Sequence, residues 1–213
     1  MDIAWIGHSA FRLRGRDAAV VMDPCPSSTG FRLNRPRAEI VTVSNAAPEF
    51  SWVPGVAGDP LQLDAPGEYE AKQVLVTGVR TPRPQRAGGD GYNTAFVITI
   101  DEVAVVHLGD LGALPTADEV EMLSQADVAL VPIGGYEHLD AAAAAQVVST
   151  LEPKLVIPML YKAGPETELL DTVEPFLKEM GAQKPETLEN HVNVTASGLP
   201  ERTTVQVLAP RGD

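Results

Sequence analysis

The feature that most constrains this chain is the change in spacing of its apolar segments between the first and second halves. Short apolar or alternating runs separated by Gly, Pro and Asp residues are typical of strands joined by turns. In the first half they lie at 3–6, 11–13, 18–22, 39–44, 62–63 and 73–79. After a predicted loop at 81–91, residues 94–100 and 103–107 predict a hairpin around Asp101 and Glu102.

In the second half, helix signals alternate with strand signals. Thr116 and Glu119 have the spacing of a capping box, which predicts a helix to about Ser124. Asp140 is a suitable N-cap for an alanine-rich helix over 141–151. A third helix is predicted over 167–180 and ends at Gly181, and strands are predicted at 127–133, 154–159, 191–195 and 203–208. This order favours an α/β layered sandwich, and without a long linker or repeat we expect one domain over 1–213.

Charge and cysteine content indicate which binding partners and which cellular compartment are expected. Acidic residues number 29 against 16 basic ones, a formal net charge of −13, which disfavours nucleic acid and anionic membranes as partners. The single cysteine, Cys25, excludes an intrachain disulfide framework. No basic segment followed by an apolar one opens the chain, and no apolar run approaches the roughly 18 residues of a membrane span. We therefore expect a cytoplasmic protein.

Several short segments, in order along the chain, resemble one branch of the metallo-β-lactamase superfamily. The resemblance is to small metal-dependent hydrolases related to ascorbate-6-phosphate lactonases. It implies a four-layer αββα sandwich with a dinuclear zinc site at one end of the sheets. The segments are Trp5–Phe11, Met22-Asp23-Pro24, Pro66–Glu70, Asn93-Thr94, His107–Gly112, Val131–Gly135 and Pro153–Lys162.

The resemblance also places the expected metal ligands. In that family a strand ending in Thr-Val-Ser leads into His-x-His-x-Asp-His, and here residues 42–44 lead into 45–50 instead. The alignment puts a different residue at five histidine positions and keeps carboxylates at the two aspartate positions. The histidine positions hold Asn45, Ala47, Phe50, Arg83 and Leu160, and the aspartate positions hold Glu49 and Asp110.

These residue types do not suit catalytic zinc. Zinc in enzymes takes about three nitrogen, sulfur or oxygen ligands and keeps a water position open. Asp110 and Glu49 are the anionic ligands left, and two carboxylates alone suit a hydrated Mg²⁺ ion better, and only loosely. Without a metal, the pKa of water is not lowered towards 7, and the family's nucleophile is not formed. We predict no zinc and no other cofactor, with Asp110, Glu49, Asn45, His8 and Arg83 as a vestigial site.

Without the positive charge of a metal ion, the two carboxylates need another cation, and this need predicts a specific contact. Two carboxylates in a partly buried cleft are costly unless a cation is supplied or one is protonated. Arg83 is permanently charged and long enough to reach inward. We therefore predict an ion pair from Arg83 to Asp110 or Glu49, with Lys162 as the reserve cation.

Other polar residues have simpler interpretations beside the functional ones. Asp110 is a former ligand or a structural carboxylate in a Gly-Asp-x-Gly turn. His8 is a general base or a hydrogen-bonded anchor, and His107 is expected to be packed and satisfied. His138 is expected to be exposed. Cys25 is expected to be a buried thiol rather than a nucleophile paired with His8.

The sequence thus predicts a degenerate, non-hydrolytic member of the family, a pseudoenzyme that binds a small molecule in the former cleft or pairs with a subunit. A homodimer, or a pair with a related subunit, is the expected assembly. The alternative is a hydrolase with an atypical single-metal or metal-free site built on Asp110, Glu49, His8 and Asn45.

Overall fold

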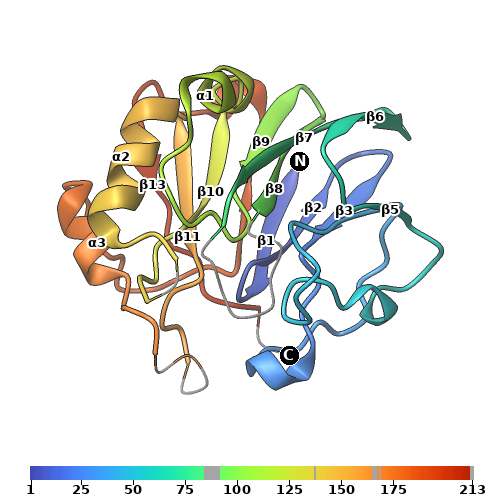
Figure 1. Ribbon diagram of the computed structural model, residues 1–213, viewed down its shortest axis with the longest axis horizontal. Helices are drawn as coiled ribbons and strands as arrows, with labels where there is room; N and C mark the ends of the chain where they lie inside the picture. The colour runs from blue at the N-terminus through green and yellow to red at the C-terminus, as the bar shows by residue number, and fades with distance from the viewer. Residues whose placement is uncertain (84–91, 137, 165–166, 168, 212–213) are drawn as a thin grey trace.

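The computed structural model describes residues 1–83, 92–136, 138–164, 167 and 169–211 (Figure 1). Its first sheet has the order β12-β1-β2-β3-β4-β5. Neighbours β12, β1, β2 and β3 are antiparallel, whereas β3, β4 and β5 are parallel. The strands are β1 (Asp2–Gly7), β2 (Ala10–Arg14), β3 (Ala19–Met22), β4 (Ile40–Thr42), β5 (Leu61–Leu63) and β12 (His191–Asn193).

The second sheet has the order β13-β11-β10-β9-β8-β7-β6. From β6 to β9 the neighbours are antiparallel, and from β9 to β13 they are parallel. The carboxyl ends of β9, β10 and β11 therefore meet at one edge of the molecule. The strands are β6 (Gly67–Ala71), β7 (Val74–Pro82), β8 (Tyr92–Ile100), β9 (Val103–His107), β10 (Val128–Pro132), β11 (Leu155–Met159) and β13 (Thr204–Val205).

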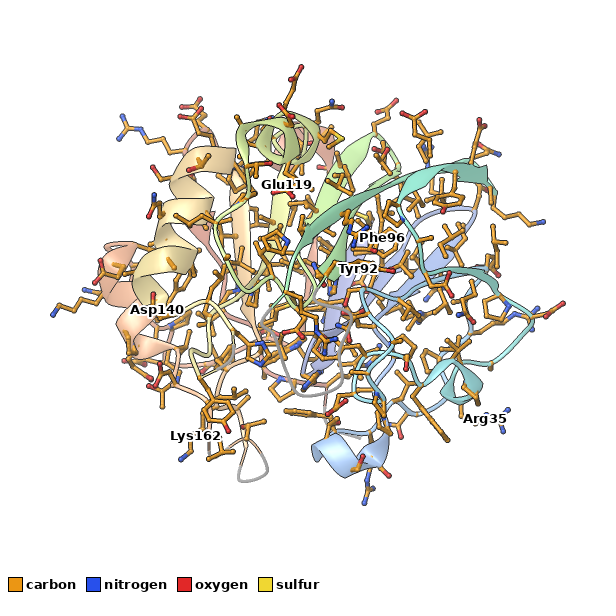
Figure 2. The ribbon with its side chains drawn as sticks, viewed as in Figure 1. Arg35, Tyr92, Phe96, Glu119, Asp140 and Lys162 are labelled. Atoms are coloured by element: carbon orange, nitrogen blue, oxygen red, sulfur yellow. The ribbon has the colours of Figure 1, made fainter. Side chains whose placement is uncertain are left out.

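The main core contains apolar side chains from both sheets. Alternation along β1 and β2 directs Trp5 and Phe11 inward, where their rings stack at 6.2 Å. Phe96 of β8 belongs to the same cluster and lies near the centre of the molecule (Figure 2). Fully burying a side chain of this size contributes roughly 1.5–3 kcal/mol, so the contact between the sheets is the main source of stability.

The helices α1 (Ala117–Leu123), α2 (Ala141–Leu151) and α3 (Glu174–Glu179) lie on the side of the second sheet (Figure 1). Helix α1 packs against β7, and α2 packs against β10 and α3. Both predicted caps are present: Thr116 and Glu119 form the capping box of α1, and Asp140 accepts a 2.8 Å bond from the Ala143 N–H.

Part of the first sheet's outer face is covered by loops, through a cluster of Val21, Ala38, Val41, Val43 and Val56. Short 3₁₀ turns are η1 (Ser27–Thr29), η2 (Val53–Gly55) and η4 (Ala196–Gly198). The two-sheet sandwich confirms the predicted metallo-β-lactamase fold.

Three local predictions are wrong. The helix predicted over 167–180 is present over Glu174–Glu179 alone, where Pro175 occupies a first-turn position. Upstream of it the chain follows tertiary contacts, because the Asp171 N–H donates to Gly134 at 2.8 Å. The strand predicted at 203–208 is present only over Thr204–Val205. Thr81 and Pro82 belong to β7 rather than to a loop, and the rest of that predicted loop, 84–91, lies outside the described residues. Among the described residues no helix is long and apolar enough to cross a membrane.

Candidate functional site

The turn that follows β9 positions Asp110. The Asn93 side chain of β8 holds this turn from both sides: its amide donates to Leu108 O at 2.9 Å, and its carbonyl accepts from the Asp110 N–H at 2.8 Å. The second amide hydrogen of Asn93 reaches the Thr81 hydroxyl at 2.8 Å. Gly109 has a φ of +58°, and a Cβ there would lie 2.4 Å from Ser44. The backbone therefore fixes where the carboxylate points.

Both carboxylate oxygens of Asp110 are engaged. The Arg83 Nε–H donates to Oδ2 at 2.8 Å, and His138 Nδ1 lies 2.6 Å from Oδ1. A carboxylate oxygen accepts, so we assign a proton to His138 Nδ1. The three side chains are at most 6% exposed, which makes this a buried, charge-assisted cluster. We call Arg83, Asp110 and His138 the Asp110 triad; it confirms the predicted Arg83–Asp110 ion pair.

The triad also corrects one prediction. His138 was expected to be exposed, but its side chain is 6% exposed and contacts Asp110. Asp110 and His138 follow the carboxyl ends of the neighbouring parallel strands β9 and β10, and this adjacency was the signal that could have joined them. The reserve cation Lys162 is not used here: it is exposed and lies at the edge of the molecule (Figure 2).

Glu49 is not the partner of Arg83. Its Oε2 is buried, and no hydrogen-bond partner for it is found among the described residues. Asn45 is held locally, since its Oδ1 accepts from the Ala47 N–H at 3.0 Å and its amide reaches Ser44 at 3.3 Å. No hydrogen bond or ion pair joins either residue to the Asp110 triad in the described part of the chain.

The remaining positions that the resemblance aligns with metal ligands belong to the core or its margin. Phe50 is 1% exposed, and Leu160 is fully buried. Ala47 is half-buried and packs against the same core. These side chains carry no ligand atom, and their packing contributes to the fold instead.

His8 combines an anchoring role with access to the site. Its backbone has a φ of +54°, and its carbonyl accepts bonds from Trp5 Nε1 at 3.1 Å and from the Leu160 N–H at 3.3 Å. Its Nδ1 lies 3.2 Å from the Ser9 hydroxyl, and its ring packs edge-on against Phe50 at 4.9 Å. The expected anchor is therefore present, and the ring also lines the pocket described below.

Asp23 and His107 form a second buried polar group, and the sequence predicted no separate role for Asp23. Asp23 accepts bonds at 2.7 Å from the backbone N–H and from the hydroxyl of Ser44. Burial raises the pKa of Asp23 to about 7. The His107 Nε2–H donates to Ser9 O at 2.8 Å, and burial lowers the pKa of His107 to about 4. The Nδ1 of His107 is 3.9 Å from Asp23 and has no hydrogen-bond partner among the described residues, so the predicted satisfaction of His107 is only partial.

Cys25 is a buried free thiol, as expected, and burial raises its pKa. A nucleophilic thiolate needs the opposite shift and some exposure. Cys25 belongs to a small apolar cluster with Ile6 and Ala10. It is therefore a packing residue.

The residues at this end of the sheets do not fit a zinc centre. Within the described parts of the chain, no three His, Cys, Asp or Glu side chains form a group that could hold a metal ion. Asp110, the ligand retained by the resemblance, already has one oxygen on a guanidinium and the other on an imidazole. A metal ion would have to displace both and then lie beside a permanent cation.

A pocket of about 440 Å³ opens beside the triad. We call it the His138 pocket; His138, His8 and Glu49 line it, together with Tyr136, which is 70% exposed, and Leu169, which is 72% exposed. Pockets that bind small molecules combine apolar surface with a few fixed polar groups. This one combines two exposed apolar side chains with two imidazoles and one carboxylate.

Comparison with known proteins gives consistent relatives. Residues 2–160 match the model of the β-lactamase superfamily domain. A UPF0173 metal-dependent hydrolase of Caldivirga maquilingensis is 24% identical, over 77% of this chain and 83% of its own. A crystal structure of a candidate zinc-dependent hydrolase of the metallo-β-lactamase superfamily from Thermotoga maritima is 30% identical, with a TM-score of 0.80 and 98% of each chain covered. A metallo hydrolase of Ignicoccus hospitalis, 18% identical, shares the fold with a TM-score of 0.67 over 98% of this chain and 95% of its own.

The family match covers most of the chain, and the Thermotoga maritima structure covers nearly all of it, so the two-sheet fold and the sequence lead to the same assignment. The chain therefore belongs to the β-lactamase superfamily domain family.

Proposed function

We propose that this chain binds a small molecule in the His138 pocket and does not carry out zinc-dependent hydrolysis. The observation that carries the proposal is the Asp110 triad: Arg83 and His138 take the two carboxylate oxygens that a metal would need. A hydrolase of this family relies on a metal to lower the pKa of its water nucleophile, and the described residues include no group of three His, Cys, Asp or Glu side chains that could hold one.

The pocket wall indicates the kind of molecule. Tyr136 and Leu169 present exposed apolar surface, whereas His138 and His8 present imidazole nitrogens. Arg83 is held back from the pocket by Asp110, so its charge is already balanced. The arrangement supports a small, partly apolar ligand with hydrogen-bonding groups, rather than a highly charged one.

Metal analysis and turnover together test the proposal. Protein incubated with excess Zn²⁺ or Mn²⁺ and then dialysed should retain less than stoichiometric metal by mass spectrometry. It should show no metal-dependent hydrolysis of lactones or phosphodiesters above background. One bound transition metal per chain, with activity lost in Asp110→Ala, would replace this proposal by the hydrolase alternative.

One observation favours a second candidate, a metal-free hydrolase. Glu49 and His8 line the same pocket, and Glu49 Oε2 is buried with no described partner. An unpaired carboxylate beside an imidazole is a candidate general base. If turnover occurs in chelator-treated protein and Glu49→Gln abolishes it while His191→Gln does not, this candidate is correct.

A further inference from the structure

A cluster of arginines lies on the outer face of the first sheet. Alternation along β2 buries Phe11 and Leu13 in the core, so Arg12 and Arg14 project to the opposite face. Arg211 joins them from the end of the chain, because its backbone N–H donates to Trp5 O of β1 at 2.8 Å. In a chain with 29 acidic and 16 basic residues, three neighbouring arginines are a local reversal of charge.

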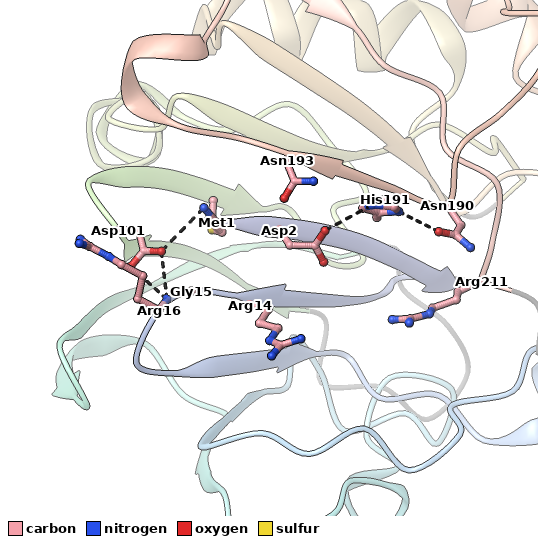
Figure 3. Close-up of a pocket in the computed structure, with 10 residues that line it drawn as sticks. All are labelled: Met1, Asp2, Arg14, Gly15, Arg16, Asp101, Asn190, His191, Asn193 and Arg211. Carbon is pink, nitrogen blue, oxygen red and sulfur yellow. Dashed lines mark hydrogen bonds and ion pairs between the residues drawn. The ribbon is translucent and has the colours of Figure 1, made fainter.

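The three arginines surround adjoining pockets. The largest has a volume of about 530 Å³ and is lined by Arg14 and Arg211 (Figure 3). Arg12 and Arg211 line a second pocket, of about 290 Å³, and Arg12 and Arg14 line a third. We call the largest the Arg14 pocket. Every pair of these arginines therefore faces a common space rather than packed protein.

The two acidic residues that line the Arg14 pocket, Asp2 and Asp101, have other partners. Asp101 interacts with the Met1 ammonium at 3.7 Å and with Arg16 Nε at 3.5 Å (Figure 3). Asp2 lies opposite Arg14 in the strand register, but its carboxylate is 3.8 Å from His191 Nε2. Among the described residues, no ion pair is found for the side chain of Arg14 or of Arg211.

The arrangement disfavours the charged form of Arg12 in particular. Burial lowers the pKa of Arg12, and the like charges of Arg14 and Arg211 lower it further. Its Nε is buried without a hydrogen-bond partner in the described chain, although its other end donates to Arg37 O at 3.3 Å. Like charges held together by a fold are relieved by an anion that accepts several charge-assisted hydrogen bonds.

We propose that Arg12, Arg14 and Arg211 form a binding site for the phosphate or carboxylate group of a small ligand, held at the Arg14 pocket. Planar guanidinium groups match the oxygen geometry of both anions. Asn190 and Asn193 line the same pocket and offer amide groups to the rest of such a ligand (Figure 3). None of its lining residues lines the His138 pocket, so this inference does not depend on the proposed function.

Titration with inorganic phosphate at constant ionic strength tests the site, with sodium chloride as the balancing salt. Saturable changes in amide chemical shifts around β1 and β2 are expected for the native chain. Arg14→Gln and Arg211→Gln should each raise the phosphate concentration at half-saturation by about tenfold, the effect of losing one charge-assisted hydrogen bond. Asp2→Asn should lower this concentration, because a repelling carboxylate is removed. Acetate and citrate titrations identify which anion is preferred.

The melting temperature, measured in two buffers, distinguishes an arginine that binds an anion from one that only supports the fold. In chloride buffer, Arg14→Gln should match or exceed the native melting temperature, because repulsion is reduced. In phosphate buffer the native chain should become the more stable one. Arg202→Gln changes an exposed arginine that lines none of these three pockets, so it is the matched control and should leave phosphate binding unchanged. Failure of phosphate and carboxylates alike to saturate, or equal losses in Arg202→Gln, rejects the site.

Discussion

The Asp110 side chain is fully buried, so its charge must be balanced by protein groups rather than by water. Arg83 supplies a formal positive charge at 2.8 Å, and His138 supplies a second donor at 2.6 Å. Removing one partner of a buried pair leaves an uncompensated charge, which costs more than the pair gains. The stability of this region therefore depends on the triad remaining complete.

Arg83→Ala is expected to lower the free energy of unfolding by about 3–5 kcal/mol, as for other broken buried pairs. Chemical denaturation measures it. The control is Arg80→Ala on β7, the strand that Arg83 follows: Arg80 is exposed and stacks on Tyr92 at 4.0 Å, a contact worth about 1 kcal/mol or less. The double variant Arg83→Ala/Asp110→Asn should recover part of the loss. Equal effects of the two alanine variants would mean that the pair does not matter.

Asp23 and His107 predict an unusual pH dependence. Between about pH 4 and 7 folded Asp23 keeps a proton that the unfolded chain has released, so its contribution to stability falls as pH rises. Between about pH 4 and 6.5 unfolded His107 binds a proton that the folded chain lacks, so its contribution rises. In the native protein, the contributions of Asp23 and His107 to the slope of unfolding free energy against pH therefore oppose each other.

Asp23→Asn should therefore make the free energy of unfolding increase more steeply with pH than in the native protein, by about 1.4 kcal/mol per pH unit between pH 4 and 7. His107→Gln should shift the slope in the opposite direction over pH 4 to 6.5. Denaturation at a series of pH values gives both difference profiles. Parallel profiles for the native protein and Asp23→Asn would show that the carboxyl titrates normally.

At the scale of elements, the turn after β9 illustrates how a loop is fixed by its neighbours. Gly109 and Gly181 both have positive φ, +58° and +63°, which an L side chain adopts at some cost. Only their surroundings differ. A Cβ on Gly109 would lie 2.4 Å from Ser44, whereas one on Gly181 meets nothing within 4 Å.

Gly181→Ala should thus cost about 1 kcal/mol, the backbone effect alone. Gly109→Ala should cost clearly more, because Ser44 and Asn93 must also move and the Asp110 carboxylate moves with the turn. Thermal or chemical denaturation of the two variants separates the contributions. A loss in Gly109→Ala no greater than in Gly181→Ala would show that the turn adjusts freely.

The elements that the sequence predicted well are those with local causes. Caps at Thr116 and Asp140 and alternation in β1, β2 and β9 depend on neighbouring residues, and these elements begin and end within a residue or two of prediction. The third helix and the burial of His138 depend on partners distant in sequence, Gly134 and Asp110. The Arg83–Asp110 pair could be predicted because a buried carboxylate needs a nearby positive charge, whatever the exact path of the backbone. Asn93 was found only as part of the resemblance, since a clamp between a strand and a turn has no local pattern.

For the whole molecule, assembly remains a prediction. The expected homodimer follows from the frequency of two-fold dimers and from an outer sheet face covered partly by loops. Light scattering at micromolar concentration should give about twice the monomer mass of 22.6 kDa. A mass that stays at 22.6 kDa as concentration rises tenfold would contradict it.

The position of Arg83 also restricts the routes by which this sequence can change. A metal ligand introduced elsewhere would gain nothing from Asp110, because both oxygens of that carboxylate are already taken, so that step brings no benefit on its own. Replacing Arg83 first leaves Asp110 uncompensated, and a protein with a stability of about 5–15 kcal/mol tolerates few such losses. Each single substitution towards a metal site at Asp110 is therefore neutral or harmful. Such a site is accessible to this sequence only through several substitutions made together.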